Sequence, residues 1–345
     1  MNLQDLDRTL FIAEIGANHD GQLDRALKLI RLAAAAGADV VKFQHYRADT
    51  LASEYGFEQL ASLAHYSDNP HRVFRKYETP WKWTPFLAET CRLNGVEFMS
   101  TPYDLVAVDH LNPYVKAWKI GSGDITYQQL IEKCAGTNKP ILLATGASHL
   151  DEVVLAVSWT GTSELCIMQC NTNYTGSEDN LQYVNLRTLW HYISVTGLSD
   201  HSRSMIPVLG AVALGAKVIE KHFTDGESES PDNSFALRPD EWAAMVGAVR
   251  QLEAALGDGA KRVEPNEVET VVLQRRCLRA ARDLSAGTIL TADDIVALRP
   301  APEGSIAPYN IDKVLGSTLA VDMKNGEEFE SLSFIQDFSN DKRRL

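Results

Sequence analysis

The sequence predicts a (β/α)8 barrel, of the TIM barrel type, followed by a small β-rich domain. Short apolar runs alternate eight times with segments of helical period over the first 257 residues. Polar side chains gather where these runs end. Beyond residue 271 the sequence changes to short strands and turns without a long helix. We therefore expect a barrel over 1–257, a linker over 258–272, a β-rich domain over 273–338 and a tail over 339–345.

Eight apolar runs are the strand candidates of the barrel. Each is short, and most end in glycine or a polar residue, which is typical of parallel strands buried on both faces. In chain order they cover residues 10–16, 40–44, 97–102, 117–123, 140–146, 165–170, 195–200 and 217–223.

The segments between these strands carry helix signals. Apolar spacing marks the first helix at Leu23, Leu27 and Ile30, and marks the last from Trp242 to Leu256. Start signals mark three others: Thr84 before Pro85, Thr126 with Gln129, and Ser148 with Asp151. An open doubly wound sheet is the alternative fold. It calls for a glycine-rich GxGxxG turn after the first strand, and EIGANHDG does not supply one.

One connection and one repeat stand out from this alternation. Residues 46–84 form a long connection rich in aromatic residues, which either covers a pocket as a lid or packs onto the barrel. Near the C-terminus, residues 281–287 recur 39 residues later as 320–326, which suggests two related hairpins.

Composition narrows the class of protein. The net charge of −13 argues against a nucleic-acid surface, and an anionic substrate would need positive charge concentrated within one pocket. The chain lacks an apolar run of eighteen residues and a signal-peptide pattern, so we expect a soluble, cytoplasmic protein without membrane contact. The five dispersed cysteines suit reduced thiols. Cys166 and Cys170 share a strand face, where core packing is the better interpretation than metal binding.

Ionisable residues concentrate at the predicted strand ends. Barrels of this type place their active sites there. Because side chains alternate along a strand, Glu14, Lys42 and Glu220 can point into the barrel mouth. Polar residues also occur wherever a strand ends at the protein surface, so a single such residue does not indicate an active site. Two lysines, two carboxylates and two histidines together favour function. The candidates are Glu14, Lys42, Gln44, Thr101, Lys119, Ser122, Asp124, Thr172, Tyr174, His201, Glu220 and His222.

Two histidines follow neighbouring predicted strands. His201 ends VTGLSDH and His222 ends KVIEKH, and an alanine-rich helical segment connects them. This βαβ arrangement brings both imidazoles to the same end of the sheet, where they can ligate a divalent metal together. The alternative is a pair of hydrogen-bonded polar residues without a metal.

The chain resembles the sialic acid synthases, which include N-acetylneuraminate, legionaminate and pseudaminate synthases. The motifs that carry the resemblance appear in the family's order and span nearly the whole chain. They are FIAEIGANHDG (11–21), GADVVKFQ (37–44), FMSTPYD (98–104), KIGSGD (119–124), GLSDH (197–201), ALGAKVIEKHFT (213–224) and SPDN (230–233), with QRRCLRAARDLSAGTIL (274–290) similar to the family's antifreeze-like (SAF, β-clip) domain.

The resemblance implies a reaction and a role for each residue. Phosphoenolpyruvate would condense with an N-acylated hexosamine to give a nine-carbon 2-keto-3-deoxy acid and phosphate. It implies Mn²⁺ or Mg²⁺ on His201 and His222 and a domain-swapped homodimer. The remaining roles are catalysis by Glu14, Lys42, Lys119 and Glu220, phosphoenolpyruvate contacts from Lys42, Thr101, Lys119, Ser122 and Thr172, and sugar contacts from Gln44, Asp124, Tyr174, Asp232 and Arg276.

Several positions depart from the family pattern. Asp124 stands where glutamate is usual, Ala144 where serine is usual, and QCNTNYTG (169–176) replaces CTxxYP. These changes put the identity of the sugar in doubt more than the reaction. Two other functions compete: a pyruvate aldolase that forms a Schiff base through Lys42 or Lys119, and a carbohydrate-binding protein on a disabled barrel.

Overall fold

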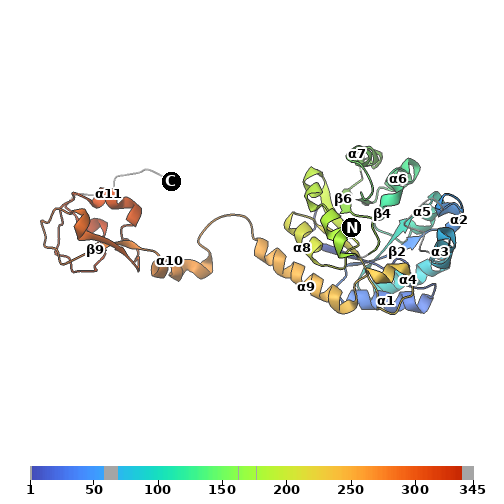
Figure 1. Cartoon of the computed structure of the whole chain (residues 1–345), viewed down its shortest axis with the longest axis horizontal. Helices are drawn as coiled ribbons and strands as arrows, with labels where there is room; N and C mark the ends of the chain where they lie inside the picture. Colours follow the sequence, from blue (N-terminus) through green and yellow to red (C-terminus); the bar gives the residue numbers. More distant parts are fainter. Residues whose placement is uncertain (1, 58–68, 162, 176, 336–345) are drawn as a thin grey trace. The chain divides into compact units, whose positions relative to one another are not determined.

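The chain folds into two compact units that divide between Gly257 and Asp258. A computed structural model describes residues 2–57, 69–161, 163–175 and 177–335 (Figure 1). The predicted tail and part of the 46–84 connection lie outside the described residues.

The N-terminal unit is an eight-stranded parallel barrel, which confirms the predicted fold class. Its strands are hydrogen-bonded in the order β3-β2-β1-β8-β7-β6-β5-β4. β3 and β4, at the two ends of this order, lie side by side and nearly close the barrel. The bounds are β1 Leu10–Glu14, β2 Val40–His45, β3 Glu97–Pro102, β4 Trp118–Ile120, β5 Ile141–Ala144, β6 Leu165–Cys170, β7 Val195–Asp200 and β8 Val218–His222.

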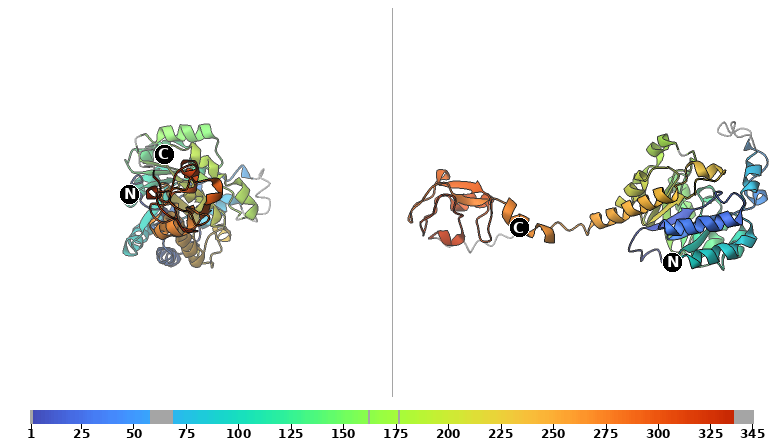
Figure 2. Two further views of the ribbon diagram at one scale, coloured as in Figure 1. Left: turned by 90° about the vertical axis from the view of Figure 1, so that its left-hand side faces the viewer. Right: turned by 90° about the horizontal axis from the view of Figure 1, so that it is seen from below.

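Helices surround these strands, as Figure 1 shows. α1 contacts both α4 and α9 on the outside of the barrel, an arrangement that can be followed in the right-hand view of Figure 2. The bounds are α1 Leu23–Ala35, α2 Ala48–Leu51, α3 Pro70–Lys76, α4 Thr84–Leu93, α5 Leu105–Leu111, α6 Gln128–Ala135, α7 Leu150–Trp159, α8 Ile206–Ala213 and α9 Pro239–Leu256.

Three helix starts differ in detail from the predicted caps. The capping box of α7 joins His149 to Glu152, because the hydroxyl of Ser148 donates to the carbonyl of Gly146 instead. Thr84 is the first residue of α4 rather than its cap. Its hydroxyl lies 2.9 Å from the ring of buried His45. The cap position of α6 is Tyr127, without a side-chain hydrogen bond.

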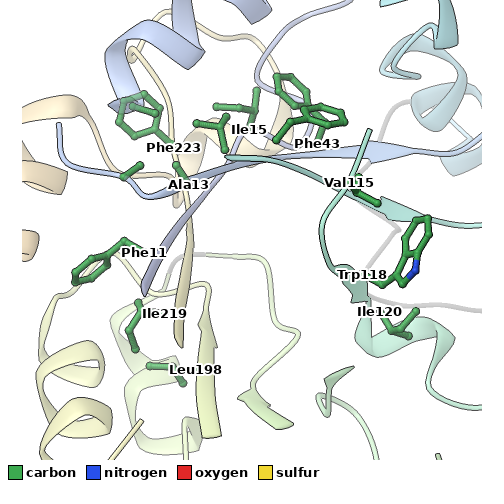
Figure 3. Close-up of a cluster of buried hydrophobic side chains, with 14 of the residues drawn as sticks. Phe11, Ala13, Ile15, Phe43, Val115, Trp118, Ile120, Leu198, Ile219 and Phe223 are labelled. Atoms are coloured by element: carbon green, nitrogen blue, oxygen red, sulfur yellow. The ribbon is translucent and has the colours of Figure 1, made fainter. Parts of the chain in front are cut away.

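The main core lies between the strands and the helices. Alternate strand residues such as Phe11, Phe43 and Ile219 point outward into this core (Figure 3). Phe11 packs edge-on against Trp242 of α9, with the ring centroids 6.5 Å apart. The opposite strand face points into the barrel. Its lower part is apolar, and Leu3 packs against it. The interior of this barrel is therefore filled at one end.

The C-terminal unit holds a small antiparallel sheet of β9 (Cys277–Ala280) and β10 (Ile295–Leu298). The recurring segments do not form separate hairpins. They pair with each other, because Leu284 bridges Met323 in antiparallel register. Asp283 accepts the backbone N–H of Asn325, and Asp322 accepts that of Ala286, so each repeat holds the other.

Two helices of this region are short, in keeping with the prediction of a region without a long helix. α10 (Val268–Gln274) begins inside the predicted linker, and α11 (Ile311–Val314) lies within the second unit. Among the described residues, no helix has both the length and the apolar character needed to cross a membrane.

Candidate active site

The interior strand face turns polar at the C-terminal end of the barrel. Apolar Ile12, Val40 and Val218 lie in the lower interior, and two residues further along each strand come Glu14, Lys42 and Glu220. Period-two alternation keeps each pair on one face. Side chains on this face surround a cavity of about 40 Å³. It is lined by Glu14, Lys42, Gln44, Thr101, Tyr103, Lys119, Gly121, Ser122, Ala144, Cys170, Tyr174, Ser199, His201, Glu220 and His222.

Two lysines and two glutamates form a buried charge cluster in this cavity. The ammonium Nζ of Lys42 lies 2.6 Å from Oε2 of Glu14 and 3.7 Å from Oε1 of Glu220. Nζ of Lys119 lies 3.3 Å from the same Oε1 atom of Glu220. All four side chains are nearly inaccessible to water. The cluster is therefore formally neutral, with each charge compensated by its neighbours.

The neighbouring charges keep Lys42 and Glu220 ionised. Burial alone would lower the pKa of Lys42, but Glu14 and Glu220 outweigh burial and raise it above the usual value. Burial alone would raise the pKa of Glu220, and the ammonium groups of Lys119 and Lys42 lower it instead. Lys42 is thus held as an ammonium ion, which is a poor nucleophile.

Uncharged groups fix the orientation of the cluster. Gln44 Nε2 donates to Glu14 Oε1 over 2.6 Å, and Lys42 Nζ donates to the hydroxyl of Thr101 over 3.2 Å. The hydroxyl of Ser199 donates to Glu220 Oε1 over 3.3 Å. Within the described part of the chain, Glu220 Oε2 is buried without a hydrogen-bond partner. This oxygen remains available to a bound molecule.

The two histidines lie side by side beneath aromatic residues. The ring centroids of His201 and His222 are 5.4 Å apart. Tyr174 lies 4.3 Å from the ring of His201, and Phe235 lies 4.7 Å from that of His222. His201 Nδ1 is 2.8 Å from the carbonyl of Asn171. The pair thus has a defined orientation in a partly apolar surrounding.

The donor set around His222 fits a cation. Its Nδ1 atom is buried and has no hydrogen-bond partner among the described residues. Oδ2 of Asp232 lies 3.4 Å from that nitrogen. Burial disfavours the charged form of Asp232, but His222 and the N–H of Ala17 hold its pKa below the usual value. In the described ranges, no group of three or more His, Cys, Asp or Glu side chains is placed so that it could hold a metal ion by itself.

Gly16 allows Asp232 to approach His222. Its φ of +51° is a left-handed conformation that glycine adopts readily. A Cβ atom at this position would lie 2.2 Å from Asp232 Oδ2 and 3.2 Å from the His222 ring. The backbone N–H of Ala17, the next residue, donates to Asp232 Oδ2 over 2.9 Å. The backbone after β1 therefore both leaves space for Asp232 and donates a hydrogen bond to it.

Four sequence candidates lie outside the cavity lining. Thr172 lines a larger adjoining cavity of about 970 Å³, which shares Cys170 and Tyr174 with the first. Asp232 reaches the site through His222, as described above. Asp124 Oδ2 lies beside Gly121, and burial raises the pKa of Asp124 to about 7. Arg276 belongs to the second unit, where its guanidinium donates to the carbonyl of Ala297 over 2.8 Å.

Five lining residues were not among the candidates: Tyr103, Gly121, Ala144, Cys170 and Ser199. Cys170 does more than pack in the core: it shares the interior face with Met168 and lines the cavity, and its sulfur lies 3.9 Å from His201 Nδ1. The alternation of side chains along β6 could have predicted that Cys170 faces the barrel interior. Tyr103 follows β3 in a turn, where alternation no longer applies, and the sequence offers no comparable signal for it.

Comparison with known families confirms the resemblance of the motifs. The profile of the NeuB family matches residues 29–261. The chain belongs to the NeuB family. The profile of the SAF domain matches residues 275–327 of the same NeuB-family chain, within the second unit.

Individual relatives cover nearly the whole NeuB-family chain. It is 34% identical to an N,N'-diacetyllegionaminic acid synthase of Campylobacter jejuni, over 93% of this chain and 99% of that protein. It is 32% identical to a pseudaminic acid synthase of the same species, over 95% and 97%. A solved N-acetylneuraminic acid synthetase of Leptospira borgpetersenii superposes with a TM-score of 0.67 at 28% identity, covering 77% of this chain and 90% of that one.

Proposed function

We propose that the protein condenses phosphoenolpyruvate with an N-acylated hexosamine, giving a nine-carbon 2-keto-3-deoxy sugar acid and inorganic phosphate with the help of a divalent metal. One observation carries the proposal: two lysines, two glutamates and two histidines face one buried cavity at the C-terminal end of the barrel. The relatives named for legionaminic and pseudaminic acid synthesis support the same reaction class.

The lysines provide the anion site of the proposed reaction. Phosphoenolpyruvate carries a carboxylate and a phosphate, so it needs fixed positive charge and hydroxyl donors. Lys42 and Lys119 supply the charge, and Thr101 and Ser122 supply hydroxyls on the same cavity wall. Thr172, in the adjoining cavity, is positioned to extend these contacts. The sugar would then be contacted by the remaining candidates of the barrel, Gln44, Asp124, Tyr174 and Asp232.

A divalent metal, Mn²⁺ or Mg²⁺, fits this charge balance. The lysines are already compensated by Glu14 and Glu220, so a bound anion calls for further positive charge. His201 and His222 would hold the ion, with Asp232 close to the second imidazole. When bound, the ion would polarise the sugar aldehyde as a Lewis acid.

The carboxylates handle the positive charge and the proton. Carbon 3 of the enol bonds to the aldehyde carbon, and the aldehyde oxygen becomes an alkoxide, which finally takes up the proton that a carboxylate receives from water. Positive charge then develops at carbon 2, where Glu14 and Glu220 stabilise it. Water adds at carbon 2 and gives a proton to one of these carboxylates. The bond from carbon 2 to the phosphate oxygen finally breaks, leaving a ketone and inorganic phosphate.

The Schiff-base aldolase is the less favoured alternative. That chemistry starts from a neutral lysine amine, and such amines have lowered pKa values. The pKa of Lys42 is raised instead. Borohydride reduction with pyruvate would trap an aldolase covalently and leave the proposed synthase unmodified. A carbohydrate-binding protein would take up sugar without turnover, and it gives no reason for a lysine and glutamate cluster in the barrel interior.

We further propose that a domain-swapped homodimer completes the site through Arg276. Its side chain is exposed on the second unit, so it is accessible to another protomer. A mixture of His222→Ala and Arg276→Ala proteins should regain activity that neither has alone, because one mixed site is intact. Lack of recovery after subunit exchange would contradict this arrangement.

The five free thiols suit a cytoplasmic location.

A screen of N-acyl hexosamines tests the reaction itself. Each sugar is incubated with phosphoenolpyruvate and Mn²⁺, phosphate release is followed, and the product mass is measured. The proposal predicts one phosphate per sugar consumed and a product heavier than the sugar by the pyruvic acid unit. Phosphate release without a sugar adduct would contradict condensation.

A further inference from the structure

We propose that the buried ion pair between Asp200 and Lys221 positions His201 and His222 to bind the metal. This inference rests on the proposed function, because it concerns the two imidazoles assigned to the metal above. Lys221 Nζ lies 2.6 Å from Asp200 Oδ2, and the two side chains are 1% and 2% exposed. Each residue directly precedes one of the two histidines.

The pair occupies an unusual place in the barrel. The outward-facing residues next to them, Leu198 on β7 and Ile219 on β8, are apolar and belong to the main core, as does Phe223 just after β8. Asp200 and Lys221 sit on that same face at the ends of their strands and are register partners in the sheet. The histidines that follow them lie on the opposite face, toward the cavity. A movement of either charged side chain is therefore transmitted to an imidazole through one peptide unit.

The ammonium group of Lys221 also anchors the loop that carries His201. Besides Asp200, it donates to the backbone carbonyls of Ser202 and of Ser204, the latter over 3.3 Å. Asp200 in turn accepts the N–H of Ser202 over 3.0 Å and the hydroxyl of Ser202 over 3.0 Å. The loop after β7 thus folds around a side chain of β8. This network fixes the start of the loop relative to β8 and hence the spacing of the two imidazoles.

Stability alone does not explain such a pair. Removing two charges from water is costly, and apolar residues of similar size often replace a buried ion pair without loss of stability. A paired variant therefore separates positioning from folding. Asp200→Asn keeps the side-chain length, Lys221→Met shortens it by one atom, and together they leave no unpaired charge.

Calorimetric titration of the full-length protein with Mn²⁺ tests the proposal. For Asp200→Asn/Lys221→Met we expect an apo thermal midpoint close to wild type and Mn²⁺ affinity weaker by about tenfold or more, the size of effect seen for residues that orient metal ligands. At saturating Mn²⁺, turnover should recover in part. Equal Mn²⁺ affinity in a folded double variant would overturn the positioning role while leaving the proposed function intact.

Two further measurements complete the test. Arg47→Met/Asp104→Asn is the control, because this more exposed ion pair of 2.8 Å follows β2 and β3 at the same end of the barrel. It should leave Mn²⁺ affinity unchanged, and an equal loss there would refute a specific role for Asp200 and Lys221. If the double variant does not fold, Ser202→Ala should still weaken Mn²⁺ binding, and unchanged affinity would again overturn the inference. A wild-type protein that binds no Mn²⁺ would refute both the metal role and this inference.

Discussion

Lys42 and Glu14 form an ion pair of 2.6 Å inside the barrel, where both side chains are almost completely buried. β1 and β2 are neighbours, and Glu14 is the register partner of Lys42. The pair therefore follows directly from strand pairing and side-chain alternation. It links the stability of the barrel to the chemistry of its cavity.

Lys42→Met should abolish phosphate release and destabilise the protein. The substitution removes an ammonium group from the anion site and leaves Glu14 and Glu220 with less compensation. Loss of one partner from a buried ion pair costs about 3–5 kcal/mol. Urea denaturation should show a lower free energy of unfolding. Adding Glu14→Gln should restore most of that free energy but no activity. Recovery of activity in the double variant would contradict a role for Lys42 in binding the substrate.

Gly16→Ala should damage the site more than the fold. Its Cβ would collide with Asp232 Oδ2, so Asp232 must move away from His222. We expect at least about a tenfold loss in kcat/KM for the sugar, equivalent to about 1.4 kcal/mol. Gly95→Ala is the matched control: its φ is also positive, at +72°, but its Cβ would meet no atom within 4 Å. It should cost about 1–2 kcal/mol of stability and no activity. Equal activity losses would argue against a role for Asp232.

His222→Ala should abolish turnover while leaving the thermal midpoint nearly unchanged. The Nδ1 atom of His222 has no hydrogen-bond partner among the described residues. Asp232, 3.4 Å from that atom, still accepts the N–H of Ala17 when the ring is removed. His45→Ala provides the contrast, because His45 is hydrogen-bonded at both ring nitrogens, to Ser100 and Thr84. That substitution should lower the midpoint clearly. A large loss of stability in His222→Ala would favour a structural histidine.

Asp124 should make the protein less stable as pH rises. Burial raises its pKa to about 7 in the folded state, against about 3.9 in an unfolded chain. Between these values the folded state retains a proton that the unfolded state has released, so stability falls with increasing pH and levels off above about 7. Thermal midpoints of Asp124→Asn relative to wild type should therefore rise from pH 4 to pH 7. If the difference between the two thermal midpoints stayed constant across that range, the pKa of Asp124 would not be raised in the folded state.

Regular periodicity explains how much of the protein could be predicted from its sequence. The fold class followed from eight strand and helix alternations and is confirmed. Alternation also indicated that Glu14, Lys42 and Glu220 share the interior face, and their side chains do line one cavity. Their catalytic roles stay predictions.

Features that depend on the path of loops were beyond the sequence. The approach of Asp232 to His222 depends on the backbone at Gly16 and on the turn after β8. The pairing of Asp283 and Asp322 with opposite repeats depends on how two similar segments cross, which a sequence repeat does not specify. Strand periodicity says nothing about either contact.

A phosphate-release assay with each component omitted in turn tests the central claim most directly. Purified full-length protein is supplied with phosphoenolpyruvate, Mn²⁺ and the N-acyl hexosamine that reacts best. We predict rapid release of orthophosphate only when all three are present, and none from the His222→Ala variant. Release that persists without the sugar or without a divalent metal, or no release with any amino sugar, would contradict the account.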